Sequence, residues 1–308
     1  MTAIISKTAV HFNSACNYIE TSRPYKIVAT ALLYIADTVA PKNELTKHRT
    51  FIFIPSFIMN SLGYISFNSS CPAGSTVSPN SEMVASVNEV FTRLVSQMEQ
   101  KCPSTKNFEW EIRVKKDSTV NAYCCPGGKV VITTGILEQL KTKTTSSITH
   151  KDLIASVLGH EITHAVAAHS AQRIQLTLLL VTTLKASTYG LSVLLFPSST
   201  DPREQEKIQI RRETLTNALD VISKIPQSLL LARHSQCHEY EADRFGIEIA
   251  HAAKFNPYAS ISLQEMFLSM DRSNENKVAA LFSSHPPSSK RLEENRKTVE
   301  MILASPAA

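Results

Sequence analysis

Apolar residues recur at helical spacing in the middle of the chain. From Glu82 onward they stand at positions 84, 87, 90 and 94, and this period predicts an amphipathic helix. A second such segment lies around residues 154–166, where the apolar positions are Ile154, Val157, Leu158, Ile162 and Val166. Both segments are therefore predicted to be helices that bury one face.

Alternating residues between these two helices predict a small sheet. The segment "WEIRVKK" from Trp110 alternates like a strand. Residues 120–140, "VNAYCCPGGKVVITTGILEQL", are predicted to form a strand, a turn, a second strand from Lys129 to Thr133 and the start of a helix. The "GGK" of the turn lacks the spacing of a phosphate-binding loop, which excludes that class of nucleotide site.

The second half of the chain is predicted to be helical. A charged helix that follows a loop at residues 197–207 is expected to end at Pro226, and another helix is expected from about residue 227 to 253. Asn256 and Pro257 give a cap and first-turn signal for a further helix. The C-terminal segment, "SSHPPSSKRLEENRKTVEMIL", is predicted to be a loop and one last helix.

Three apolar segments raise the question of membrane contact. Residues 174–196 are long enough for a span, but Lys185 near the centre favours a buried or membrane-apposed segment. Residues 51–67 are uncharged, and an amphipathic helix that packs on the domain is favoured there. The run at 27–36 is shorter than the roughly 20 residues of a spanning helix. Peripheral membrane contact is expected through 27–36 or 174–196.

A segment rich in Ser, Pro and Gly at 68–81 indicates a linker. We therefore expect an N-terminal extension at residues 1–80 and the main domain at residues 81–303. Residues 1–20 mix apolar and polar side chains and do not form an ordinary signal peptide, which keeps a cytoplasmic location open.

The net charge of +5 comes from scattered lysines and arginines, so no nucleic-acid partner is expected. The six cysteines are too sparse for a disulfide scaffold and are expected to be free thiols.

The segment "HEITH" carries the candidate chemistry. His160 and His164 are four residues apart, about 40° around a helix, so both rings can bind one metal ion. Glu161 projects about 100° away from His160, beside the metal, where it can act as a general base. A chance match of five residues is the alternative, but unpaired histidines on a half-buried helix are costly. His169 follows nine residues after His160, on the opposite side if the helix continues, which favours a supporting role.

A catalytic zinc of this type needs a third protein ligand. Candidates lie in "CHEYEADRFG", where Glu239 and Asp243 share a helix face, one to bind zinc and the other to orient an imidazole, while Glu241 projects elsewhere. The rival hypothesis makes His234 and His238 a separate metal pair, but that pair lacks an acidic partner.

Four blocks resemble the M48 family of zinc metallopeptidases, which are gluzincins. They are "NAYCCPGGKVVITTGIL", "LGHEITHAVAAHSAQR", "EYEADRFGIEIA" and "HPPSSKRLEENR", and they extend from about residue 121 to 296. The family usually has a small apolar residue before "PGG", where this chain has Cys124 and Cys125, a departure that concerns packing. No convincing pair of transmembrane helices is seen, so the prenyl-protease activity of polytopic members is not expected.

The resemblance implies a role for each matching residue. His160, His164 and Glu239 match the zinc ligands, and Glu161 matches the general base. Asp243 matches a supporting carboxylate. His285 matches a histidine that contacts substrate or the open metal position.

The resemblance also implies a fold and a function. The fold is α+β, predominantly helical, a zincin-type metallopeptidase domain with a small sheet next to the "HEITH" helix. The strand at residues 129–133 is expected to be the edge strand that pairs with extended substrate. The expected function is that of a zinc endopeptidase with one Zn²⁺ per chain and protein or peptide substrates, in quality control of membrane-associated or misfolded proteins. A membrane-associated or cell-envelope location is favoured. The alternatives are a zinc-containing chaperone or assembly factor with latent activity, and a zinc-stabilised helical scaffold.

Overall fold

The computed structural model describes residues 42–48, 52, 54–273 and 278–304, apart from the side chains of 218–235, 273 and 280. The chain divides into two compact units. The larger comprises Val39–Ala171 and Cys237–Ala308, and the smaller comprises Met1–Thr38 and Gln172–Gln236. The domain boundary expected after residue 80 stays a prediction.

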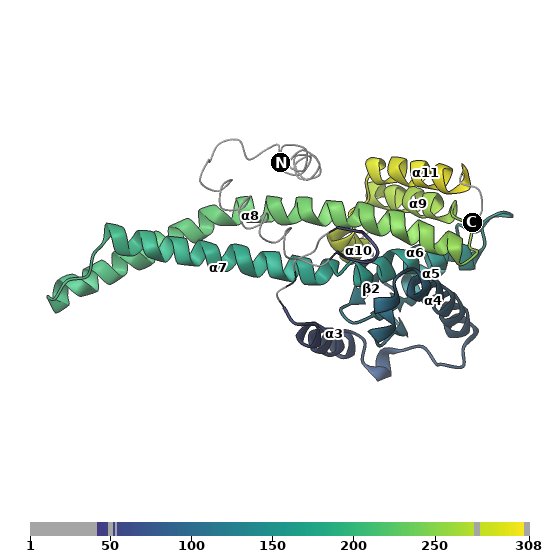
Figure 1. Ribbon diagram of the computed structural model, residues 1–308, viewed down its shortest axis with the longest axis horizontal. Helices are drawn as coiled ribbons and strands as arrows, with labels where there is room; N and C mark the ends of the chain where they lie inside the picture. Colours follow the sequence, from purple (N-terminus) through teal and green to yellow (C-terminus); the bar gives the residue numbers. More distant parts are fainter. Residues whose placement is uncertain (1–41, 49–51, 53, 274–277, 305–308) are drawn as a thin grey trace. The chain divides into compact units, whose positions relative to one another are not determined.

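The larger unit is predominantly helical, with one small sheet, and confirms the expected fold class (Figure 1). Its elements in chain order are α3 (Ser56–Ser70), α4 (Glu82–Lys101), β1 (Glu111–Lys115), β2 (Ala122–Cys125), β3 (Lys129–Thr133), α5 (Thr134–Lys141), α6 (His150–Val166), the end of α8 (Pro202–Ala252), α9 (Ala259–Ser273), α10 (Ala279–Ser284) and α11 (Ser289–Ala304). Two short 3₁₀ turns lie at Ala73–Ser75 and Pro103–Asn107.

The sheet has the strand order β1-β3-β2, with β3 parallel to β1 and antiparallel to β2. The expectation that residues 129–133 form an edge strand is therefore wrong, because β3 is paired on both sides. The segment before α4 covers the outer edge of β1, where the Val77 N–H donates to the Val114 carbonyl. In the part of the chain that the structure describes, no strand pairs with the outer edge of β2.

Helix α6, which carries "HEITH", is the central element of the core. It begins with a capping box, in which the Thr149 hydroxyl accepts from the Asp152 N–H and the Asp152 carboxylate accepts from the Thr149 N–H. Its apolar residues are almost fully buried, and it packs against β2, α4, α5 and α9. It ends at Val166, and Ala168 then adopts a left-handed conformation with φ of 57°. These two local signals define where the helix begins and where it ends.

Helices α6 and α8 approach each other closely at two glycines. A Cβ atom added to Gly246 would lie 2.8 Å from the His160 nitrogen, and one added to Gly159 would lie 2.8 Å from the Gly246 carbonyl oxygen. Only glycine fits this approach, because both obstructing atoms belong to the backbone. The contact brings the residues of α8 that precede Gly246 against the histidines of α6.

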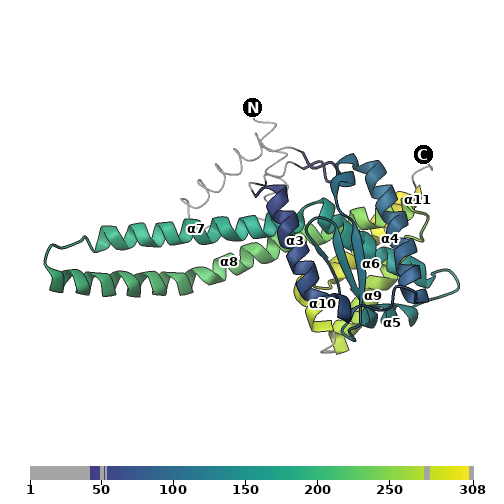
Figure 2. The same cartoon turned by 90° about the horizontal axis from the view of Figure 1, so that it is seen from below.

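Helix α3 packs on the sheet, as expected for residues 51–67, but it begins at Ser56 and is not amphipathic (Figure 2). It buries Met59, Gly63 and Phe67, while its outer face exposes large apolar side chains at Phe57, Leu62 and Ile65. The cysteines of the described residues are free thiols, as expected.

The smaller unit contains a helical hairpin of α7 (His169–Leu195) and the first part of α8, which run side by side in both views (Figures 1 and 2). Helix α8 continues through Pro226, so the expected helix end there is wrong. A proline inside a helix removes one backbone hydrogen bond but does not have to end the helix.

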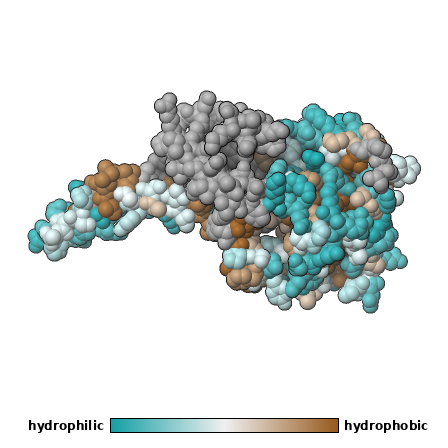
Figure 3. All heavy atoms as spheres, viewed as in Figure 1, coloured by the Kyte–Doolittle hydropathy of each residue, from teal (hydrophilic) through white to brown (hydrophobic). Residues whose placement is uncertain are grey.

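Helix α7 is mostly exposed, which excludes the buried alternative for residues 174–196. Exposed apolar side chains include Tyr189, Leu194 and Leu195, and hydrophobic surface gathers on the hairpin (Figure 3). Within the described residues, α7 is the one helix that is long and apolar enough to cross a membrane. The run at 27–36 lies outside the described residues.

Candidate metal centre

Four side chains from three parts of the chain converge beside α6. His160 and His164 come from α6, Glu239 from α8, and His285 from the residue that follows α10. One ligand atom of each lies within 4.8 Å of those of the other three. The Glu239 carboxylate is buried and the two α6 histidines are nearly so, with side-chain exposures of 12% and 11%. Such a gathering of three imidazoles and a carboxylate is the donor set that zinc prefers.

The spacing of the donor atoms also fits one ion. His160 Nε2 lies 3.0 Å from His164 Nε2 and 3.2 Å from His285 Nδ1. The Glu239 carboxylate lies 3.4 Å from His160 Nε2 and 3.3 Å from His164 Nε2. Ligand atoms at about 2.0–2.1 Å from a tetrahedral zinc are separated by about 3.3 Å. The donor set and its spacing therefore fit zinc.

The sequence comparison decides the family. The model of peptidase family M48 matches residues 82–299, which is more than half of the chain. The chain belongs to peptidase family M48. Members of this family are metal-dependent peptidases, typically with zinc.

Several relatives of this chain are named metalloendopeptidase OMA1. The chain is 30% identical over 210 residues to mitochondrial metalloendopeptidase OMA1 of Schizosaccharomyces pombe, which covers 67% of the chain and 50% of that protein. It is 29% identical to the OMA1 of Saccharomyces cerevisiae, covering 71% and 56%, and 25% identical to mitochondrial metalloendopeptidase OMA1 of Homo sapiens, covering 70% and 37%. The chain thus spans about half or less of the length of these relatives.

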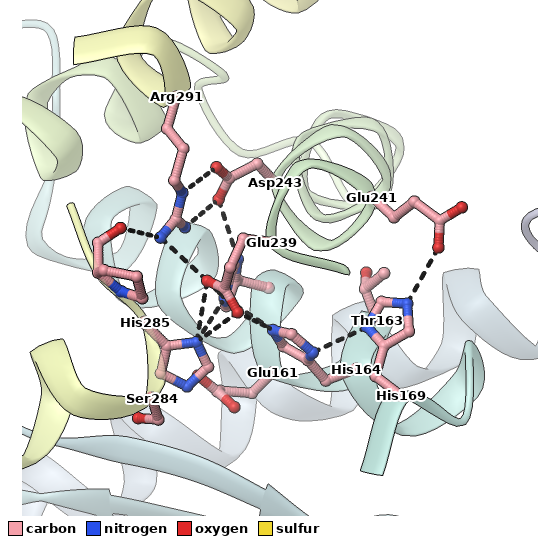
Figure 4. A network of polar contacts seen from close by, with 12 residues as sticks. Glu161, Thr163, His164, His169, Glu239, Glu241, Asp243, Ser284, His285 and Arg291 are labelled. Atoms are coloured by element: carbon pink, nitrogen blue, oxygen red, sulfur yellow. Dashed lines mark hydrogen bonds and ion pairs between the residues drawn. The ribbon is translucent and has the colours of Figure 1, made fainter. Parts of the chain in front are cut away.

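Asp243 lies one turn beyond Glu239 on α8 and contacts His160. Its Oδ1 atom accepts a hydrogen bond from His160 Nδ1 at 3.0 Å, which leaves His160 Nε2 facing the other donors. Asp243 itself is held by Arg291 from α11 through two bonds of 2.7 Å. Arg291 also lies 2.9 Å from Glu239 (Figure 4). One buried guanidinium therefore contacts the carboxylates of both Asp243 and Glu239.

Sequence analysis missed Arg291. The residue stands in the block "HPPSSKRLEENR", six residues after His285, but nothing local marks one basic residue of an amphipathic helix as buried. The sequence did contain one indication. Glu239 and Asp243 share a helix face, and two acidic side chains that are buried together require a cation nearby.

The charges of the site shift several pKa values. Burial lowers the pKa of His160, but the hydrogen bonds with Asp243 and Glu239 outweigh burial and raise that pKa to about 10. Burial lowers the pKa of His164 well below its ordinary value. Burial raises the pKa of Glu239, yet the neighbouring histidines lower it well below the ordinary value, so this carboxylate is ionised at neutral pH. A metal ligand has to be deprotonated, so a cation that binds here has to displace the proton of His160.

Glu161 lies beside the donor group and faces a pocket. Its Oε1 atom is 3.6 Å from His285 Nε2, and its side chain is almost fully buried. The pocket is apolar on one side, and its lining includes Glu161, His160, Ala122, Val157, Leu263, Phe267 and Gln264. Within the described residues, the buried Gln264 Oε1 has no hydrogen-bond partner. A carboxylate next to a pocket is placed to exchange a proton with a molecule bound there.

The other candidates of the sequence lie outside the donor group. Glu241 projects to another side of α8, as expected, and pairs with His169. His238 is buried and stacks on His169 with ring centroids 4.0 Å apart. The side chain of His234 is outside the described residues, so a metal pair of His234 and His238 stays a hypothesis.

Proposed function

We propose that this protein is a zinc-dependent endopeptidase that cleaves peptide bonds of protein substrates. The observation that carries the proposal is the Glu161 carboxylate beside the convergent donor atoms of His160, His164 and Glu239. A metal-stabilised scaffold has no chemical use for a buried carboxylate that faces a pocket. Family membership supports the same reaction class.

His160, His164 and Glu239 would hold one Zn²⁺ per chain, with His285 as a fourth donor from a separate segment. Zinc supplies Lewis-acid chemistry, which polarises a carbonyl group and makes water more acidic. Asp243 keeps His160 in the tautomer whose Nε2 lone pair faces the site.

Glu161 acts as the general base and then as the general acid. Its carboxylate takes a proton from the water that attacks the scissile carbonyl and gives it to the amine that leaves. The alternative to a fourth metal donor is a contact of His285 with the substrate or the oxyanion through Nε2, which lies 3.6 Å from this carboxylate.

The edge of β2 is the proposed binding site for the substrate backbone. An extended peptide can add to an unpaired strand edge, and Ala122 of β2 lines the same pocket as Glu161. The apolar lining favours an apolar substrate side chain, and the Gln264 oxygen favours a hydrogen-bond donor on it or beside it.

We propose a location in mitochondria, next to a membrane. The relatives are named mitochondrial, and the exposed apolar surface of α7 supports membrane contact through residues 174–196. Misfolded or membrane-associated proteins are the proposed substrates. A chaperone or assembly factor with latent activity is the second candidate, and the exposed face of α7 is the observation that favours it.

The test measures zinc per chain and cleavage of casein for the wild type, Glu161→Gln and Glu138→Gln. Glu138 is an exposed residue of α5 and provides the matched control. We expect one zinc in all three proteins, and a loss of cleavage of about 100-fold or more only in Glu161→Gln.

Each other outcome has a definite meaning. Zinc in all three proteins without cleavage in any would contradict the endopeptidase and support the latent chaperone. Equal cleavage by Glu161→Gln and wild type would remove Glu161 from the reaction. A wild type without zinc would overturn the metal centre itself.

A further inference from the structure

His169 is a buried residue that the proposed reaction does not use. Its spacing from His160 would place it on the far side of a continuous helix. The helix does not continue, because α6 ends at Val166 and Ala168 takes the left-handed conformation, with φ of 57°. This single residue redirects the chain, so that His169 begins α7 with its ring next to His164. An alanine tolerates that conformation less readily than glycine, so the surrounding contacts have to hold it there.

His169 makes one polar contact through each ring nitrogen. Nδ1 lies 2.8 Å from Nδ1 of His164, and Nε2 lies 3.0 Å from the Glu241 carboxylate (Figure 4). The second Glu241 oxygen lies 2.8 Å from His48 Nδ1, at a half-exposed side chain. His169 itself is only 3% exposed, and its ring stacks on His238 with an interplanar angle of 7°. The ring is therefore fixed both by its stacking partner and at each nitrogen.

Glu241 determines which ring nitrogens of His169 and His164 carry a hydrogen atom. The Glu241 carboxylate lies between two imidazole nitrogens, His169 Nε2 and His48 Nδ1, and an ionised carboxylate only accepts hydrogen bonds. Glu241 therefore accepts the N–H of His169 Nε2, and Nδ1 of a neutral His169 is left as an acceptor. The Nδ1–H of His164 donates to it. The remaining nitrogen of His164, Nε2, then presents a lone pair towards Glu239 and His160.

We propose that Glu241 and His169 are a positioning pair that holds His164 in its metal-binding tautomer and orientation. The inference rests on the proposed zinc site. Asp243 performs the same task for His160 through one direct contact. The two histidines of "HEITH" are thus supported by separate groups, one carboxylate acting directly and the other through an intervening imidazole. Such supporting contacts typically change metal affinity by about 10- to 100-fold.

The experiment uses the full chain and two substitutions of His169 with opposite effects. His169→Phe keeps an aromatic ring to stack on His238 but has no acceptor for His164. His169→Asn loses the ring but offers a carbonyl oxygen near the position of Nδ1. Glu241→Gln is the third variant. The glutamine amide can donate a hydrogen bond to His169 Nε2 as well as accept one from it, so it no longer determines the tautomer of His169.

Zinc affinity is measured by competition with a chromophoric chelator, and thermal unfolding of the metal-free proteins reports stability separately. We expect His169→Phe to bind zinc about 10- to 100-fold more weakly than the wild type. His169→Asn is expected to retain most of the affinity despite the larger loss of stability, and Glu241→Gln to fall between them.

The opposite order, with His169→Asn the weakest binder and His169→Phe like the wild type, would show that His169 only fills space and would overturn the inference. Unchanged affinity in Glu241→Gln would remove Glu241 from the pair, even if the His169 variants failed to fold. A wild type that binds no zinc would overturn the proposed function and this inference together, whereas a zinc-binding wild type with the wrong order of variants would overturn this inference alone.

Discussion

Arg291 is the cation on which the geometry of two buried carboxylates depends. Its guanidinium group contacts Asp243 and Glu239, and its side chain is 5% exposed. Each of these carboxylates would lose its cationic partner if the guanidinium were removed, and a buried charge without a partner is costly. Arg291 thus contributes to the stability of the fold and to the shape of the metal centre at once.

We predict that Arg291→Met lowers the free energy of unfolding by about 3–5 kcal/mol. Arg291→Lys is expected to recover only part of that loss, because one ammonium group cannot form the paired bonds of a guanidinium. Urea unfolding measures both values. Arg296→Met is the control, since Arg296 forms an exposed ion pair with Glu265 and its loss is expected to cost less than about 1 kcal/mol. Equal effects of the Arg291 and Arg296 variants would contradict the prediction.

His285 is the one member of the donor group whose removal leaves the three ligands of a catalytic site. Four protein donors are typical of closed structural zinc sites, and catalytic sites keep one position open. His285 comes from the segment that follows α10 and not from α6 or α8, which supply the other three donors.

We predict that His285→Ala retains one zinc per chain and cleaves an unstructured peptide several-fold faster than the wild type. The measurements are metal content and the initial rate of cleavage. A slower rate with full zinc content would instead assign His285 to the stabilisation of the oxyanion.

Helices α6 and α8 can form the site only because they approach at Gly159 and Gly246. The residues that must meet, His160 on one helix and Glu239 and Asp243 on the other, lie within two turns of this contact. The helix separation at the contact therefore determines the distances among the ligands.

We predict that Gly246→Ala lowers stability by about 1–3 kcal/mol and weakens zinc binding as well. The added Cβ would lie 2.8 Å from the His160 nitrogen, a backbone atom that can move only if a helix moves. Chemical unfolding and chelator competition give the two values. Gly190→Ala on α7 is the control, because no atom lies within 4 Å of its added Cβ, and a gain of up to about 1 kcal/mol is expected there. Normal zinc affinity in Gly246→Ala would separate the helix contact from the site.

The stability of the larger unit as a whole is expected to depend on its metal. The donors come from α6, α8 and the segment after α10, which are brought together only in the folded chain. A ligand that binds only the native state stabilises it, by about 2.7 kcal/mol at a free concentration of 100 times the Kd.

We predict that EDTA lowers the melting temperature and that added zinc restores it in proportion to the logarithm of its free concentration. Glu161→Gln is expected to show the same shift as the wild type, because Glu161 is no ligand, and His160→Ala is expected to show little or none. Differential scanning calorimetry measures the shift. An identical shift in His160→Ala would place the metal elsewhere.

The sequence by itself determined the features that depend on neighbours along the chain. The period of 3.6 residues places His160 and His164 on one face with Glu161 beside them, and alternation with a glycine turn gives the hairpin of β2 and β3. The family followed from such local blocks.

Only the tertiary structure decided which distant residues meet. In the folded chain, β3 is paired on both sides and Arg291 contacts Asp243. Helix α8 continues through Pro226, and the left-handed conformation of Ala168 allows His169 to contact His164. Local patterns specify which face of an element is apolar, but strand order and helix ends depend on the free energy of contacts between residues far apart in sequence. That free energy can outweigh a helix break at a proline or the cost of a left-handed alanine.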